Sequence, residues 1–209
     1  MKNIIIVGDS FCAHPQGWPS MLADKLNLKL ISYGVGGEHW WGVHEFLKTV
    51  DKNTVKYIIF AHTFGQRIPT LHKNSIDKTA SELYYKHIHN EEFLNWAQEQ
   101  WFKQISTEWD NVINLHCFPW TWDLRHLLVG INVGPNLASI SLNEVDATEP
   151  LVDESVIGQG LRRQNHLNQF NNKILAEELA GIINNYSAGD VQLDVTKFQL
   201  KTEKWFNWR

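Results

Sequence analysis

The stretch Asn3-Ile4-Ile5-Ile6-Val7-Gly8-Asp9-Ser10 lies at the start of a 209-residue chain and indicates its fold class. Residues 3–7 form a β-branched run without polar alternation, which is typical of a strand buried on both faces of a parallel sheet. Gly8 ends this run and Ser10 follows it directly. The stretch therefore predicts an α/β fold organised around a central first strand.

Strand-like and helix-like segments alternate along the rest of the chain. Further strands are expected at residues 28–33, 55–61 and 111–117, and helices at 19–26, 40–50, 82–105 and 165–184. This alternation predicts one domain over residues 1–209, a three-layer α/β/α sandwich with a central parallel sheet. Because ligands bind beyond the carboxyl ends of such strands, the loops at residues 8–17, 34–41, 61–68 and 117–122 should converge on one site.

Two segments are harder to interpret. Residues 123–160 are expected to form an insertion with little regular structure, although residues 127–133 are compatible with a strand or a loop. Residues 190–209 form a C-terminal aromatic tail, compatible with an edge strand, a hairpin or a contact with a second subunit in a homo-oligomer.

Composition narrows the classes of partner and compartment. A formal charge of −4 at pH 7 argues against nucleic acid or an anionic membrane surface as the main partner. The sequence shows neither a signal peptide nor a membrane-spanning run, so a cytoplasmic location is expected. Cys12 and Cys117 form no metal-binding pair and are expected to be small core residues in a reduced compartment. His62, His87 and His89 lack the spacing of metal ligands, so neither a metal nor a cofactor is expected.

The residues around Ser10 suggest chemistry. A serine just past a buried strand presents its hydroxyl, and its amide lies where helix-start donors are free, although a plain turn or N-cap serine would have the same position. Another glycine-rich loop, Gly34-Val35-Gly36-Gly37, follows the second expected strand. A glycine there lets a backbone amide approach a substrate oxygen without a Cβ in the way.

These motifs resemble those of the SGNH or GDSL-type serine hydrolases, a family with a flavodoxin-like sandwich. The resemblance rests on Gly8-Asp9-Ser10, on Gly37 with Gly36 as the alternative, and on His166 at the start of the last helix. It implies that Ser10 is the nucleophile, that His166 is its general base, and that the amides of Ser10 and Gly37 form an oxyanion hole.

Two positions depart from the family pattern. Thr63 stands where the family has an asparagine donor, and its hydroxyl is expected to donate to the oxyanion in its place. Arg163 stands where an aspartate would orient the histidine, which makes Asp146 and Asp153 the candidates for the missing acid.

The expected activity is hydrolysis of an ester. Asp9, Trp40, Trp41 and Arg67 are the candidate substrate-binding residues. The tryptophan-rich loops favour an acylated carbohydrate because flat indoles suit sugar faces, while core packing is the alternative role for Trp18, Trp40, Trp41, Trp120 and Trp122. A non-catalytic binding or structural module on the same fold is the rival interpretation. A nucleotide-binding flavodoxin-like protein, suggested only by residues 34–37, is a third.

Overall fold

A central parallel sheet organises the protein. The computed structural model describes residues 2–63, 65, 67, 78–140 and 167–199, and the statements below concern these. Within them the sheet has six strands in the order β2-β1-β3-β4-β5-β6, and every neighbouring pair is parallel. The strands are β1 (Asn3–Gly8), β2 (Lys29–Gly34), β3 (Val55–His62), β4 (Val112–His116), β5 (Ile131–Gly134) and β6 (Gly189–Gln192).

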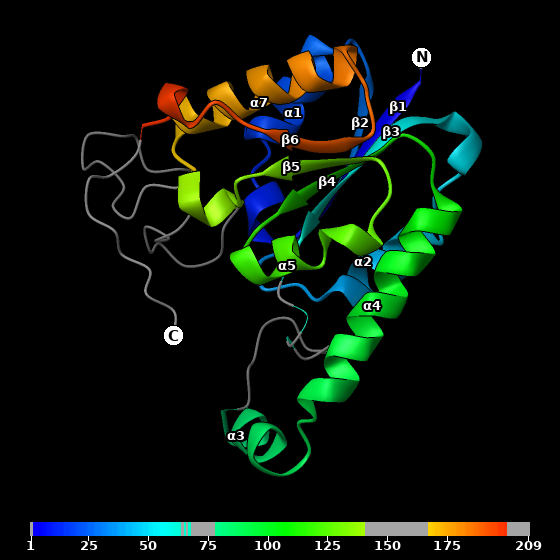
Figure 1. Ribbon diagram of the computed structural model, residues 1–209, viewed down its shortest axis with the longest axis vertical. Helices are drawn as coiled ribbons and strands as arrows, with labels where there is room; N and C mark the ends of the chain where they lie inside the picture. The colour runs from blue at the N-terminus through cyan, green and yellow to red at the C-terminus, as the bar shows by residue number, and fades with distance from the viewer. Residues whose placement is uncertain (1, 64, 66, 68–77, 141–166, 200–209) are drawn as a thin grey trace.

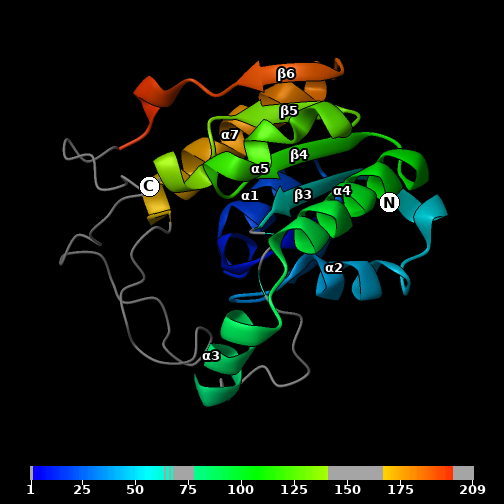
Figure 2. The same cartoon turned by 60° about the horizontal axis from the view of Figure 1, so that its bottom comes forward.

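Helices cover both faces of this sheet, which gives the expected three layers (Figure 1). On one face α1 (Trp18–Lys25) packs against α7 (Gln169–Asn184), and on the other lie α2 (Trp40–Leu47) and α4 (Glu91–Glu108). In both views α3 (Lys78–His87) lies at the far end of α4, away from the sheet (Figure 2). The three-layer α/β/α prediction is therefore confirmed.

The first strand shows why the sequence folds this way. Ile4 and Ile6 face the apolar core beneath α1 and α7, whereas Ile5 and Val7 face the core beneath α2 and α4. All four side chains are 0% exposed, because successive residues of a strand point to opposite faces and both faces are covered. Burial of both faces is what the unbroken β-branched run predicted.

The single long helix predicted at residues 82–105 was wrong. The structure has two helices there, and Asn90 separates them by accepting a 2.8 Å hydrogen bond from the backbone amide of Phe93. Asn90 followed by Glu91 and Glu92 is an N-cap signature that marks the start of a new helix.

Part of the segment predicted to be an irregular insertion belongs to the sheet. Residues 131–134 form β5, and residues 125–127 and 137–140 form short 3-10 helices on either side. The start of the C-terminal tail supplies β6, a parallel edge strand beside β5 rather than a hairpin. Residues 141–160 and 200–209 lie outside the described part of the chain.

None of the helices in the described part of the chain is both long enough and apolar enough to cross a membrane.

Candidate active site

The strand ends converge where the sequence analysis expected them to. Gly8 is in register with Gly34 on β2 and with Ala61 on β3, so three strands end at the same level. Between β1 and β3 the chain order of the sheet reverses. Such a switch point leaves a crevice between two diverging loops, and it is where open α/β sheets bind ligands.

Ser10 lies at this switch point, at the start of a short 3-10 helix, Ser10–Cys12, that follows β1. The residue is partly exposed, whereas its neighbours Asp9 and Phe11 are buried. Neither its hydroxyl nor its amide is hydrogen-bonded to any described residue. No described residue therefore competes for either group.

Gly37 lies on the loop after β2, with φ at +73°, and is exposed. An added Cβ would meet nothing within 4 Å, so glycine is needed here for its backbone conformation and not for lack of space. Within the part of the chain that the structure describes, the Gly37 amide donates no hydrogen bond. Gly34 has the opposite constraint, because a Cβ there would lie 2.5 Å from the backbone carbon of Cys12.

The carboxylate of Asp9 is fully buried beneath Ser10. Its Oδ1 accepts hydrogen bonds from the Phe11 amide at 3.0 Å and from the Cys117 thiol at 3.5 Å. Its Oδ2 accepts from the Thr63 hydroxyl at 2.9 Å and from the Arg67 guanidinium at 2.8 Å. Four donors saturate this carboxylate, so Asp9 lies behind the Ser10 turn, and its role in substrate binding stays a prediction.

Thr63, at the end of β3, is also buried, and its hydroxyl hydrogen is used in the bond to Asp9. A hydroxyl carries only one hydrogen, so Thr63 can donate to an oxyanion only after releasing Asp9. Its role as an oxyanion donor stays a prediction with that condition attached.

The two cysteines lie below the same turn, and both are free thiols in the core, as the sequence analysis expected. Burial raises the pKa of Cys12 and of Cys117 well above the usual value, and the Asp9 carboxylate raises both further. Both side chains are therefore neutral thiols, and the Cys117 thiol can donate to Asp9.

The two neighbouring tryptophans on α2 have different surroundings. Trp40 stacks on Trp101 at a centroid distance of 5.8 Å and packs against the core, which favours the packing role for this residue. Trp41 is 45% exposed and its ring lies tilted against that of His44, at a centroid distance of 5.0 Å, so part of its indole remains accessible. Trp18 is completely buried, and the side chains of Trp120 and Trp122 lie outside the described part.

His39 is a buried site neighbour that the sequence analysis missed. Its Nδ1 accepts from the Trp41 amide at 3.1 Å and so caps α2, while its Nε2 faces the Gly65 carbonyl at 3.4 Å. Burial is the main cause that lowers the pKa of His39, to about 4. A histidine directly before a helical pattern was the available signal, but histidine is not among the usual capping residues.

His166 lies outside the described residues, as do Arg163, Asp146 and Asp153. The structure does describe the chain from Leu167 onward. Asn168 caps α7, and the Asn172 side-chain oxygen accepts from the Trp18 amide at 2.8 Å. The start of α7 is thereby attached to the start of α1, the helix that follows the Ser10 turn.

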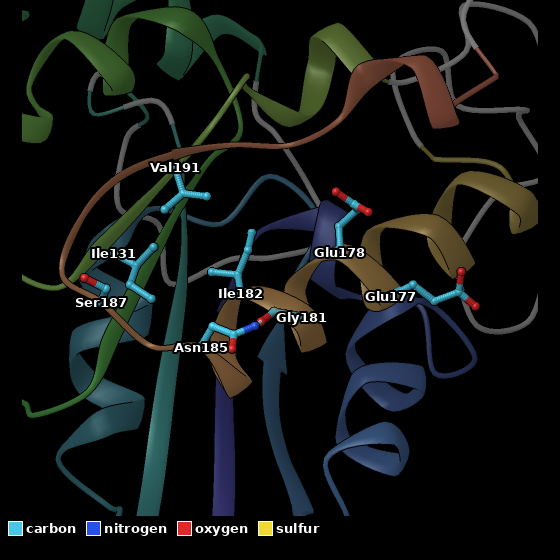
Figure 3. A pocket seen from close by; sticks show the side chains of 8 residues that line it. All are labelled: Ile131, Glu177, Glu178, Gly181, Ile182, Asn185, Ser187 and Val191. Carbon is cyan, nitrogen blue, oxygen red and sulfur yellow. Dashed lines mark hydrogen bonds between the residues drawn. The ribbon is translucent and has the colours of Figure 1, made fainter.

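Neither a cluster of metal ligands nor the groove in Figure 3 lies at Ser10 within the described part of the chain. Among the described residues, no group of three or more histidine, cysteine, aspartate or glutamate side chains has the arrangement of a metal site. An open groove of about 390 Å³ lies far from Ser10, between α7 and strands β5 and β6 (Figure 3). Its lining includes the first residue of β5 and Ser187, which places it toward the amino ends of the strands.

Two solved structures are similar to this chain. A protein of the G-D-S-L lipolytic family from Desulfitobacterium hafniense DCB-2 has a similar structure, with a TM-score of 0.50 and 13% sequence identity, over 87% of this chain and 99% of that one. A carbohydrate esterase family 2 enzyme with a carbohydrate-binding domain, from Corynascus thermopiles (Myceliophthora fergusii), matches at a TM-score of 0.42 and 11% identity, over 88% of this chain and 66% of that one. No protein-family model and no curated protein sequence matches the chain.

The first of these likenesses confirms the fold that the sequence resemblance implied. The chain has the flavodoxin-like α/β/α architecture of the GDSL-type hydrolases. At this level of identity the likeness concerns the fold alone, so activity has to be argued from the site.

Proposed function

We propose that this protein is a serine hydrolase that cleaves an ester through Ser10. The observation that carries the proposal is the contrast at the switch point, where a partly exposed serine, whose hydroxyl and amide bond no described residue, follows an aspartate that accepts four hydrogen bonds. A nucleophile has to be accessible while its support stays fixed. The same fold in a G-D-S-L family protein supports this reading.

The proposed reaction has two steps. The Ser10 Oγ attacks the ester carbonyl carbon, and its proton passes to His166, which then gives it to the departing alcohol. Water hydrolyses the resulting acyl-serine and restores the free hydroxyl. The amides of Ser10 and Gly37 are the proposed donors to the oxyanion, and one such donor is typically worth about 3 kcal/mol.

We further propose an acylated carbohydrate as the substrate class. Trp41 supports this because its exposed indole lies four residues after Gly37, and a flat aromatic face suits a sugar ring.

A non-catalytic ligand-binding module is the second candidate. The observation that favours it is the Thr63 hydroxyl, which is committed to Asp9 and leaves two backbone amides as donors. Arg163, which stands where the resemblance implies an aspartate, also favours a non-catalytic module.

Turnover of p-nitrophenyl acetate by four proteins separates the candidates. The wild type and Ser187→Ala, a control at the far groove, should be active, whereas Ser10→Ala and His166→Ala should lose at least about 1000-fold in kcat. A folded wild type without turnover of this ester or of acetylated sugars would favour the binding module.

The acid partner of His166 is tested by the pH–rate profiles of Asp146→Asn, Asp153→Asn and Arg163→Asp. A large loss in one asparagine variant would identify a relocated acid, since loss of a triad aspartate costs about 10⁴-fold elsewhere. A gain confined to Arg163→Asp would indicate that the wild type works without one. Identical profiles in all of them would contradict His166 as the base.

A further inference from the structure

The loops that carry Ser10 and Gly37 are joined by a single guanidinium nitrogen. The Arg67 Nη1 donates to Asp9 Oδ2 at 2.8 Å and to the backbone carbonyl of Glu38 at 3.0 Å. Asp9 directly precedes Ser10, and Glu38 directly follows Gly37. Arg67 itself follows β3, so it bridges the turns after β1 and β2 from a third loop.

Asp9 extends this connection to a fourth strand. Its carboxylate accepts a hydrogen bond from the Thr63 hydroxyl, just after β3, and another from the Cys117 thiol, just after β4. A buried carboxylate is costly unless it is paired and fully hydrogen-bonded, so these bonds resist rearrangement. The Ser10 turn is therefore held from beneath by the ends of β3 and β4, which both lie on one side of β1 in the sheet.

A second contact joins the loop after β2 to the loop after β3. The His39 Nε2 lies 3.4 Å from the Gly65 carbonyl, one residue beyond the Glu38 carbonyl that Arg67 binds. Gly65 is packed so closely on Gln98 that an added Cβ would lie 2.2 Å from the Gln98 Oε1. The loop that carries Arg67 therefore packs against α4, and this contact holds the guanidinium in place.

This geometry differs from the substrate-binding role that the sequence suggested for Arg67. The Asp9 carboxylate balances the charge of the guanidinium, and both hydrogens of Nη1 are used within the protein. The guanidinium also lies over the Phe118 ring, 5.9 Å from its centroid. An arginine held in this way fits an internal bridge better than an anion receptor.

We propose that Arg67 is a positioning residue that sets the separation between the amides of Ser10 and Gly37. The proposal rests on the proposed function, in which these two amides form the oxyanion hole. Donors to an oxyanion act only when they are held in place before the reaction. Loss of the bridge should therefore lower kcat and leave substrate affinity nearly unchanged.

The test compares Arg67→Met and Arg67→Lys with Arg125→Met, which removes a surface arginine that pairs with Asp190 at 2.8 Å. Two readouts are needed, kcat and KM for the neutral ester p-nitrophenyl acetate, and amide hydrogen exchange of peptides covering residues 9–13 and 35–39. We expect Arg67→Met to lower kcat about 10- to 100-fold with KM within about 2-fold, and to accelerate exchange in both peptides. Arg67→Lys should recover part of both effects, and Arg125→Met should show neither.

Three results would overturn the proposal: unchanged exchange in the two peptides, a raised KM with unchanged kcat, or a lowered melting temperature with unchanged kcat of the folded protein. If Arg67→Met does not fold, Arg67→Lys decides by the same criteria. Hydrogen exchange needs no activity, so a wild type without esterase activity would contradict the proposed function while the exchange data still decide whether Arg67 couples the two loops.

Discussion

Asp9 and Ser10 are neighbours in sequence and have opposite surroundings. The Asp9 carboxylate is buried and accepts four hydrogen bonds, whereas the Ser10 hydroxyl has no partner among the described residues. A single peptide unit thus joins a fixed support to an accessible hydroxyl. At the residue scale, the site is defined by this contrast between a buried, fully bonded carboxylate and a partly exposed hydroxyl.

Replacing Asp9 tests how much its buried pair stabilises the protein. We expect Asp9→Asn to lower the free energy of unfolding by about 3 kcal/mol, because it leaves Arg67 without a counter-charge in a largely buried place. The control is Asp190→Asn, which breaks the half-exposed Arg125–Asp190 pair and should cost less than about 1 kcal/mol. Urea unfolding followed by circular dichroism measures both, and equal losses would contradict the supporting role of Asp9.

The adjacent residues Trp40 and Trp41 should respond differently to substitution. Trp40→Ala removes a ring packed on Trp101 and should cost about 3 kcal/mol of stability. Trp41→Ala should change stability by less than about 0.5 kcal/mol, since nearly half of its surface is exposed.

In the proposed function, Trp41→Ala should also raise KM for an acetylated monosaccharide about 5-fold while leaving KM for p-nitrophenyl acetate unchanged. The reverse pattern, a stability loss at Trp41 and a KM effect only at Trp40, would exchange their roles.

At the scale of elements, the site depends on how closely the strand ends approach one another. Gly8 and Gly34 lie side by side in register, and the backbone of the Ser10–Cys12 turn packs onto Gly34. Glycine at both positions lets three loops meet without side chains between them.

Gly34→Ala should therefore destabilise the protein strongly, although it adds only one methyl group. Its Cβ would lie 2.5 Å from Cys12 C and 2.7 Å from Ala13 N, backbone atoms that move only with the Ser10 turn. We expect a loss of at least about 1–3 kcal/mol and an altered rate of any reaction at Ser10. Gly181→Ala on α7 meets nothing within 4 Å and should stabilise the helix by about 0.5–1 kcal/mol. Equal melting temperatures for the two variants would contradict the packing described for Gly34.

Most of the elements could be predicted from sequence because their apolar patterns are local. The run at residues 3–7 and the parallel sheet followed from periodicity alone, and the serine after β1 followed from its position. The break at Asn90 was missed because apolar residues continue across it, and the sequence did not decide between a strand and a loop at residues 127–133 because the four residues of β5 give little periodicity.

The Asp9 network could not be predicted in the same way. Its members lie between 2 and 108 positions from Asp9, and only the register of the sheet brings them together. Candidates such as Thr63 and Arg67 were identified as site residues, but their inward-facing bonds depend on long-range packing.

At the scale of the whole molecule, buried histidines lie in the core near the carboxyl ends of the strands. The His62 Nε2 donates a 2.9 Å hydrogen bond to the Asn114 Oδ1, and its ring lies 5.5 Å from that of His116. Burial is the main cause that lowers the pKa of His62 and of His39 to about 4, and it lowers the pKa of His116 further. The folded protein therefore keeps these rings neutral at pH 7.

This arrangement predicts that stability falls in mild acid. An unfolded histidine titrates near pH 6.5 and these rings titrate lower, so the unfolded chain binds more protons between pH 6.5 and about 4. The free energy of unfolding is therefore highest above pH 6.5. It decreases as the pH falls below 6.5, by about 1.4 kcal/mol per pH unit for each such histidine.

Urea unfolding between pH 7.5 and 4.5 measures this dependence. His62→Gln should flatten the slope, and His87→Gln, on the exposed end of α3, should leave it unchanged. A slope that does not change in His62→Gln would show that this ring binds its proton at the same pH in the folded and the unfolded protein.

The central claim is that Ser10 is an activated nucleophile, and covalent labelling tests it most directly. Wild type, Ser10→Ala and Ser187→Ala are treated with a fluorophosphonate, and the intact mass and the modified peptide are determined by mass spectrometry. The account predicts one adduct on Ser10 in the wild type and in Ser187→Ala, and none in Ser10→Ala. A folded wild type that gains no adduct, or gains it on another residue, would contradict the account.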